Sequence, residues 1–151
     1  MAKGFLSHVD FSAGDPEKSI AFYDVLLTSL GYTRYRAPDA EWQDPKPTRA
    51  AWSLQYEDGT SFGIDLRPAT SNATRIYDRC EPGPHHIAFN VDSDDEVDEV
   101  YRSMVLIGAE VLDAPSQYGG QQGYGDYYYA AFFADPDKFK VEVTHANGFD
   151  K

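Results

Sequence analysis

The chain has 151 residues, enough for one ordinary domain that buries about two-thirds of its unfolded surface, and its 42% hydrophobic content excludes a disordered protein. It carries 25 Asp and Glu against 13 Lys and Arg, and this net charge of −12 makes nucleic acid and anionic membrane surfaces poor partners. No apolar run approaches the roughly 20 residues of a spanning helix, the N-terminus lacks a secretory signal, and Cys80 is the single cysteine, so we expect a cytoplasmic protein without an intrachain disulfide.

The first half of the chain predicts one strand, one helix and three further strands. Residues 5–13 mix apolar and polar positions as a partly buried strand does. Asp15 is the predicted N-cap of the helix that follows, with Pro16 at its first position. Asp58 and Gly59 stand between two alternating runs, which is typical of a β-hairpin turn.

The second half predicts the same order of elements. A boundary is expected at residues 69–83, which show little periodicity and lead into Pro-Gly-Pro. It separates module one, at about 4–68, from module two, at about 84–146, within a single domain that covers residues 1–151. The strand HHIAFNV opens module two, a helix follows, and three more strands end at FKVEVTH.

The two halves also match residue by residue, which predicts an internal duplication. Adding 78 to the residue number carries three aromatic or histidine positions of the first strand and helix onto identical residues, and adding 77 aligns FGIDL with FKVEV. The matched positions are His8 with His86, Phe11 with Phe89, Tyr23 with Tyr101, and Asp65 with Glu142. The predicted fold is therefore α+β, with two tandem βαβββ modules that share one cleft.

Each repeat places a histidine on its first strand and a carboxylate on its last strand. Packing gives no obvious reason to keep such an ionisable pair in both halves, because a buried carboxylate is costly unless it is paired or binds a metal. Two imidazoles and one or two carboxylates suit one divalent ion, such as Zn, Ni, Mn, Fe or Co. We therefore predict that His8, His86 and Glu142 bind a metal ion, with Asp65 as a fourth ligand directly or through water.

The sequence resembles the vicinal oxygen chelate superfamily, which includes glyoxalases, extradiol dioxygenases and bleomycin-resistance proteins. The matching pieces are HVDF with DPEKSIAFY, HHIAFNV, and DPDKFKVEV, and the resemblance covers nearly the whole chain. It implies paired strand-helix-three-strand modules that form a half-barrel cleft around a divalent metal. The metal would be held by His8, His86 and Glu142, with Asp65 at the family's variable position. It also implies a homodimer.

Two positions depart from that family's pattern. Lys138 follows DPD where the family often has glycine, which is expected to alter the turn but not the metal site. Ser12 stands four residues after the first histidine, where glyoxalases that use glutathione commonly have arginine, and this weakens the glutathione hypothesis.

A metal with open coordination positions predicts an enzyme that acts on a small substrate with vicinal oxygens. For an isomerase or lyase, Glu142 or Asp65 would serve as the catalytic carboxylate that moves a proton. For a ring-cleaving dioxygenase, two histidines and one carboxylate form the facial triad of non-haem Fe(II). The sequence does not choose between these reactions.

Candidate substrate-binding residues lie near both predicted ligand strands. Arg67 stands two residues after Asp65 and could bind a substrate carboxylate. Residues 116–132, rich in glycine and tyrosine, are expected to form a flap, with Tyr127 and Tyr129 as donors or stacking faces. Strand alternation predicts that His85 points away from His86.

Two other functions stay open at this point. A metal-free binding protein of the bleomycin-resistance type would use the same fold as an aromatic cleft, although it would need no ligand set. A divergent stress or regulatory protein could keep the metal for structure alone. Metal content would separate the first alternative from the two metal-binding hypotheses.

Overall fold

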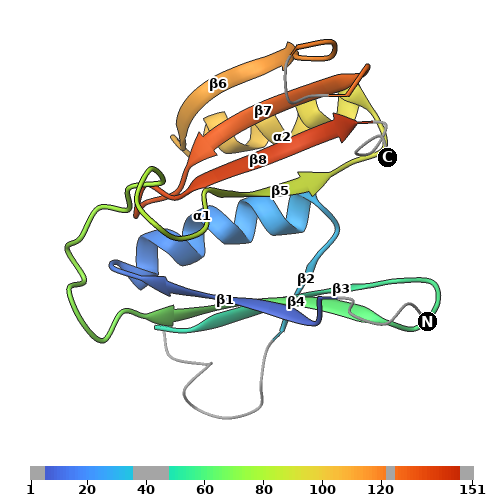
Figure 1. Cartoon of the computed structure of the whole chain (residues 1–151). Coiled ribbons are helices and arrows are strands. Elements are labelled where there is room, and N and C mark those ends of the chain that lie inside the picture. The colour runs from blue at the N-terminus through green and yellow to red at the C-terminus, as the bar shows by residue number, and fades with distance from the viewer. Residues whose placement is uncertain (1–5, 36–47, 122–124, 147–151) are drawn as a thin grey trace. The chain divides into compact units, whose positions relative to one another are not determined.

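A computed structural model gives the fold, and it describes residues 6–35, 48–121 and 125–146. The chain divides into two compact units, Met1–Arg75 and Ile76–Lys151. This division falls inside the stretch 69–83 that the sequence marks as the boundary between the modules. Each unit is a sheet with one helix packed on it, and the two are described separately below (Figure 1).

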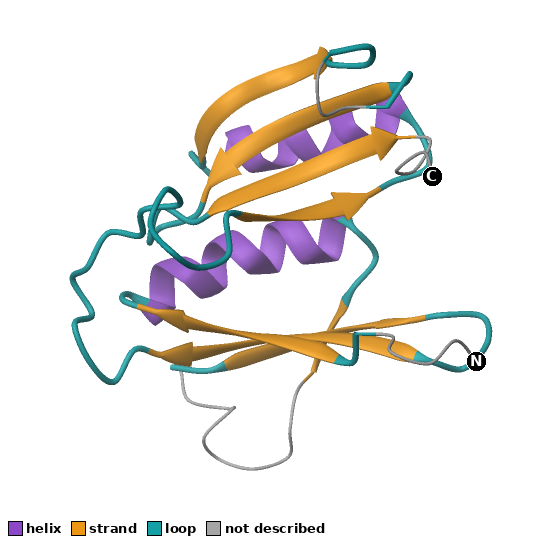
Figure 2. Ribbon diagram, viewed as in Figure 1, coloured by secondary structure: helices purple, strands orange, loops and turns teal. Residues whose placement is uncertain are grey.

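The first unit has the order strand, helix and three strands that the sequence predicts (Figures 1 and 2). Its strands form a mixed sheet in the order β1-β4-β3-β2, in which β1 and β4 are parallel and the other pairs are antiparallel. The elements are β1 (His8–Ala13), α1 (Pro16–Ser29), β2 (Thr33–Tyr35), β3 (Ala50–Gln55) and β4 (Ser61–Pro68).

The second unit repeats this architecture. Its strands lie in the order β5-β8-β7-β6, again with one parallel pair, β5 with β8, at one side. The elements are β5 (His86–Asn90), α2 (Asp94–Leu106), β6 (Glu110–Gln117), β7 (Tyr128–Ala134) and β8 (Lys140–Ala146). The predicted βαβββ order and the α+β fold class are thus confirmed.

Local sequence signals explain where the first helix and the first hairpin begin and end. The Asp15 side chain caps α1 by accepting from the Lys18 backbone N–H at 3.3 Å, and Pro16 occupies the first turn. Gly59 has a φ of +82°, the left-handed conformation that glycine adopts at no steric cost, and it closes the turn between β3 and β4. Both predictions for this half are confirmed.

The sequence also predicts the N-terminus of the second helix, because Ser93 is followed three residues later by Glu96, the spacing of a capping box. Ser93 is the N-cap of α2 and accepts from the Glu96 backbone N–H at 3.3 Å. The Glu96 carboxylate turns back and accepts from the Asp92 backbone N–H at 2.8 Å. This is close to the reciprocal capping box that the Ser93 and Glu96 spacing predicts, with the return bond one residue earlier.

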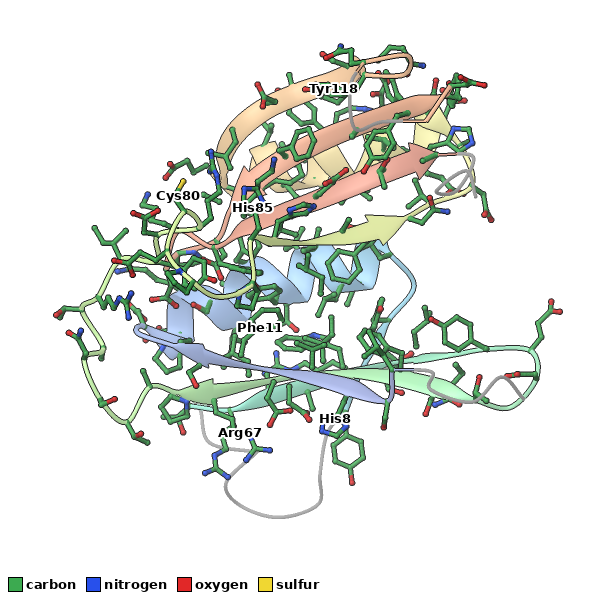
Figure 3. The ribbon with its side chains drawn as sticks, in the orientation of Figure 1. His8, Phe11, Arg67, Cys80, His85 and Tyr118 are labelled. Atoms are coloured by element: carbon green, nitrogen blue, oxygen red, sulfur yellow. The ribbon has the colours of Figure 1, made fainter. Side chains whose placement is uncertain are left out.

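In each unit, one face of the sheet packs against the helix and the other faces away from it. Alternation along β4 places Ile64 and Leu66 in the core with Trp52 of β3, all at 1% exposure or less. The side chains between them, such as Asp65, lie on the opposite face, which we call the open face of the first sheet. Figure 3 shows His8 and Arg67 on that face, directed away from α1, and Phe11 on the α1 side.

The second sheet has the same two faces. Val141 and Val143 of β8 and Phe133 of β7 are fully buried on the α2 side. Glu142, between the two valines, therefore belongs to the open face of the second sheet, where His86 of β5 also lies by strand register. Burying each large apolar side chain contributes about 1.5–3 kcal/mol, so these alternating core positions fix which face every neighbouring residue occupies.

Strand register confirms the internal duplication. His8 pairs with Gly63 in the first sheet, as His86 pairs with Lys140 in the second. Two residues later in each first strand, Asp10 pairs with Asp65, and Ala88 pairs with Glu142. The offsets of 78 and 77 that align the sequence halves therefore also relate the strand pairs of the first sheet to those of the second.

Parts of two predicted loops lie outside the described residues. The sequence also predicts a loop at residues 38–48, which are rich in Pro and charge, and of these only residue 48 is described. The predicted flap at 116–132 includes residues 122–124, which lie outside the described ranges. The rest of the predicted flap includes the ends of β6 and β7, so the connection itself spans 118–127. Across the described residues, we find no helix with the length and apolar character required to traverse a membrane.

Candidate metal centre

The closest approach between predicted ligands is made by His86 and Glu142 on the open face of the second sheet. His86 Nε2 lies 3.2 Å from Glu142 Oε2. His86 is the first residue of β5, and Glu142 is the third residue of the parallel neighbour β8, so the sheet itself sets their separation. The His86 side chain is 35% exposed, whereas that of Glu142 is 2% exposed.

Tyr128 holds the other oxygen of this carboxylate. Its hydroxyl donates to Glu142 Oε1, from the start of β7. The predicted substrate contacts are Tyr127 and Tyr129 and do not include Tyr128, although strand parity could have identified Tyr128 as a neighbour of Glu142. Tyr128 is an even number of residues from Phe132, the β7 partner of Glu142, and therefore shares the open face.

Burial sets the protonation tendencies of the pair. Burial raises the pKa of the Glu142 carboxyl, and the hydrogen bond from Tyr128 and the charge of Lys140 oppose this effect only in part. Burial also lowers the pKa of His86, assisted by the positive charges of Lys140, His85 and Arg79. His86 is therefore neutral at physiological pH, which is the form of histidine that binds metals.

His85 corrects one prediction. Alternation predicted that it points away from His86, but the two Nδ1 atoms lie 2.7 Å apart and the rings meet edge to face. The reason is that β5 begins at His86, so residue 85 precedes the strand and does not follow its alternation. Because one of these Nδ1 atoms must donate to the other, the tautomer of His86 is coupled to that of His85.

The first sheet brings its own histidine and carboxylate to one face, with a different set of partners. His8 of β1 and Asp65 of β4 lie on the open face, where the charge of His8 acts on Asp65. Burial and the neighbouring Asp10 raise the pKa of Asp65, and Arg67 and His8 act in the opposite direction. Arg67 Nη2 lies 2.9 Å from Asp10 Oδ2, so the predicted substrate-binding arginine already pairs with a carboxylate.

Tyr127 and Tyr129, the predicted substrate contacts, bond to helix α2. The Tyr127 hydroxyl donates to Asp94, and the Tyr129 hydroxyl donates to Asp98 at 3.0 Å. His145 also lies on the α2 side, 2.8 Å from Asp94, as its odd spacing from Glu142 predicts. The substrate role of the two tyrosines stays a prediction, and their hydroxyls are engaged on the face that Glu142 does not share.

The His86 and Glu142 pair fits a divalent metal in chemistry and in spacing. An ion about 2.1 Å from both atoms, with an angle of about 90–110° at the ion, would set a nitrogen and an oxygen ligand about 3.0–3.4 Å apart. The observed 3.2 Å falls in this range. The held carboxylate and the oriented imidazole also match the outer hydrogen bonds that metal ligands usually have.

Within the ranges 6–35, 48–121 and 125–146, no three His, Cys, Asp or Glu side chains form a group able to hold a metal ion. The structure thus brings His86 and Glu142 into contact in the second unit, and it places His8 and Asp65 on one face of the first sheet without a direct contact between these two described residues. The four-residue ligand set stays a prediction.

Comparison with known families agrees with the duplicated fold. The model of the Glyoxalase/Bleomycin resistance protein/Dioxygenase superfamily matches residues 5–143. The chain belongs to this superfamily. The match includes both modules and all four predicted ligands.

Proteins similar to this chain match it over nearly their whole length. The uncharacterised protein YqjT of Bacillus subtilis is 26% identical over 141 residues, which cover 92% of this chain and 97% of that protein. A crystal structure from Bacillus halodurans, described provisionally as a glyoxalase, is 26% identical with a TM-score of 0.68, and the match covers 95% of this chain and 96% of that one. A glyoxalase/dioxygenase structure from Nostoc punctiforme has a TM-score of 0.66 at 18% identity, covers 98% of this chain and 97% of that one, and shows the fold alone.

Proposed function

We propose that the protein is a divalent-metal-dependent, glyoxalase-like enzyme that acts on a small substrate with vicinal oxygens. The observation that carries this proposal is the approach of His86 Nε2 to the buried Glu142 Oε2 at 3.2 Å on an open sheet face. Burial raises the pKa of this carboxylate, and among the described residues no Lys or Arg lies within ion-pair distance of it, so a cation beside it would offset the cost of its buried charge.

The proposed ligand set is His8, His86 and Glu142, with Asp65 direct or through water. The repeat supports the first-module pair, because His8 and Asp65 occupy the register positions that His86 and Glu142 occupy in the second module. When bound, a divalent ion would polarise a carbonyl or gather two neighbouring oxygens of the substrate. We infer a homodimer from the superfamily resemblance.

The chain's own residues would orient the ligands and move a proton. Tyr128 holds Glu142, and the His85 contact orients the His86 ring and couples the tautomers of the two histidines. Asp65 is the better candidate for a proton acceptor, because burial and Asp10 raise its pKa toward the working range and it lies on an open face. Glu142 could take the same role if it left the ion during turnover.

Metal content tests this proposal directly. Elemental analysis of the purified full-length protein should find about one divalent ion per chain. The variants His86→Ala and His8→Ala should lose most of this metal. His145→Ala is the matched control, since it removes a strand histidine that faces α2 instead. Equal metal in all four proteins would reject the ligand set, and no metal in any of them would favour a metal-free binding protein of the bleomycin-resistance type.

Mixing the two histidine variants shows which chains supply each ion. If one chain provides all ligands, a mixture of His8→Ala and His86→Ala chains recovers no metal. If two chains share each ion, a mixed dimer recovers one complete ligand set out of two. Oxygen uptake with catechols and a hemithioacetal assay then separate a dioxygenase from an isomerase or lyase.

A further inference from the structure

Lys140 is the residue on the open face of the second sheet that the proposed function leaves without a role. It begins β8 and pairs in register with His86, two residues before Glu142 on the same face. The corresponding position in the first sheet is Gly63, opposite His8. The lysine is therefore a feature that the second module has and the first lacks.

The Lys140 ammonium is held in place by an aromatic ring. Its Nζ lies 3.8 Å from the centroid of the Phe132 ring, which is buried at 2% exposure. A lysine over the face of an aromatic ring keeps its charge and gives up some of its freedom of movement. Within the described residues its three N–H donors have no hydrogen-bond acceptor, so they can bind another group.

Arg79 supplies a second positive charge that acts on Lys140. Arg79 lies in the segment before β5 and adds positive charge near His86 and Lys140, whereas Glu142 and Asp113 act on Lys140 with the opposite sign. In the described part of the chain, neither Arg79 nor Lys140 has a carboxylate within ion-pair distance, whereas Lys138 pairs with Glu110 and Arg67 pairs with Asp10. Lys140, without an ion-pair partner among the described residues, thus lies on the same sheet face as His86 and Glu142.

The negative net charge of the protein bears on the role of Lys140. At a net charge of −12, the protein repels small anions at long range, so an anionic ligand would need local cations to bind. A half-buried lysine without a carboxylate also costs folding free energy. Both facts favour a role in binding over a role in stability.

We propose that Lys140, with Arg79 beside it, binds an oxyanion on the substrate, so that the substrate is a small compound with a carboxylate or phosphate near its vicinal oxygens. This deepens the proposed function and rests on it for the neighbouring ion, but the anion subsite itself needs no metal. Ammonium and guanidinium groups bind carboxylate and phosphate oxygens through charge-assisted hydrogen bonds. The substrate's anionic group would therefore contact Lys140 and not Arg67, because the Arg67 guanidinium already pairs with Asp10.

An NMR titration of the full chain tests the subsite. Phosphate and succinate are added separately at constant ionic strength, to protein as purified and again after dialysis against a chelator. We expect saturable amide shifts around residues 85–86, 132 and 139–141, and binding that is at least about tenfold weaker in Lys140→Met. The ligand that binds more tightly identifies the phosphate or the carboxylate class.

Matched variants make the result decisive. Lys138→Met removes the same charge two residues away and should bind like the wild type, and Lys140→Arg should retain binding. Unchanged binding in Lys140→Met, loss in Arg67→Met instead, or no saturable shift with either anion would overturn the inference. Because chelator-treated protein should bind equally well, a failure of the metal proposal leaves this result readable.

Discussion

The two modules have the same strand register but carry different chemistry on their open faces. In the second module, Glu142 is buried, is held by Tyr128, and lies beside His86. In the first, the shorter Asp65 shares its face with a second carboxylate, Asp10, where the second module has Ala88. The duplicated backbone therefore supplies one pair that is well ordered for a metal and one whose carboxylates are partly engaged with each other and with Arg67.

The largest expected effect tests this asymmetry. Glu142→Gln should weaken divalent metal binding by about a hundredfold or more, because it removes a charged ligand atom that the sheet positions 3.2 Å from His86. Asp65→Asn should weaken it by about tenfold or less. Calorimetric titration with zinc and with manganese measures both, and equal losses for the two variants would show that the modules contribute alike.

The next effect concerns the residue that orients Glu142. Tyr128→Phe removes the hydroxyl that donates to Glu142 Oε1. It should reduce metal affinity by about tenfold, which is the lower end of the cost of losing a hydrogen bond that orients a metal ligand. Tyr129→Phe is the control on the same strand, because its hydroxyl donates to Asp98 of α2. If the two variants bind metal equally well, Tyr128 does not position the carboxylate.

The buried carboxylate also predicts a pH effect in metal-free protein. Burial raises the folded-state pKa of Glu142 above its ordinary value of 4.5, so the protonated form is favoured on folding. The stability this provides is present at low pH and is lost as the pH rises from that ordinary value through the folded-state pKa. Glu142→Gln, which imitates the protonated form, should therefore melt a few degrees above the metal-free wild type at pH 7.

Thermal unfolding between pH 4 and pH 8 checks this effect. The advantage of Glu142→Gln should vanish toward pH 4, where the wild-type carboxyl is itself protonated, and it should reverse when metal stabilises the wild type at pH 7. Glu99→Gln alters an exposed carboxylate of α2 and should leave the melting temperature unchanged at every pH. A less stable Glu142→Gln at pH 7 without metal would contradict the assignment of burial as the dominant effect.

The smallest effect compares the two turns that precede the last strands. Gly59 closes the turn before β4 at a φ of +82°, but Lys138 occupies a left-handed conformation at +71° before β8. Lys138→Gly should raise the free energy of unfolding by up to about 1 kcal/mol, because glycine adopts this conformation without steric cost. Chemical denaturation measures the change, and a loss of stability would show that the Lys138 ion pair with Glu110 outweighs the strain.

The sequence predicts most of the fold because its signals are local. Helix caps at Asp15 and Ser93, and the turn at Asp58 and Gly59, depend on residues a few positions apart. The duplication adds the register, since one offset for first strands and another for last strands fixes which residues face each other. The departure of Lys138 from the family's glycine was also visible, although its positive φ was not.

The contacts around the candidate site were harder to predict because they depend on where each strand begins and on how far side chains reach. His85 contacts His86 because β5 begins one residue later than the pattern HHIAFNV indicates. Tyr128 was missed among consecutive tyrosines, where only the register with β8 identifies the one that shares a face with Glu142. The pairing of Arg67 with Asp10 depends on two neighbouring strands, and neither sequence segment contains that information alone.

Crystals grown with manganese and measured for anomalous scattering provide the most direct test of the central claim. The account predicts one strong peak bonded to both His86 Nε2 and a Glu142 carboxylate oxygen, with the His8 imidazole of the same or a neighbouring chain as a further ligand. A peak elsewhere, or none while His86 and Glu142 keep their direct contact, would contradict it.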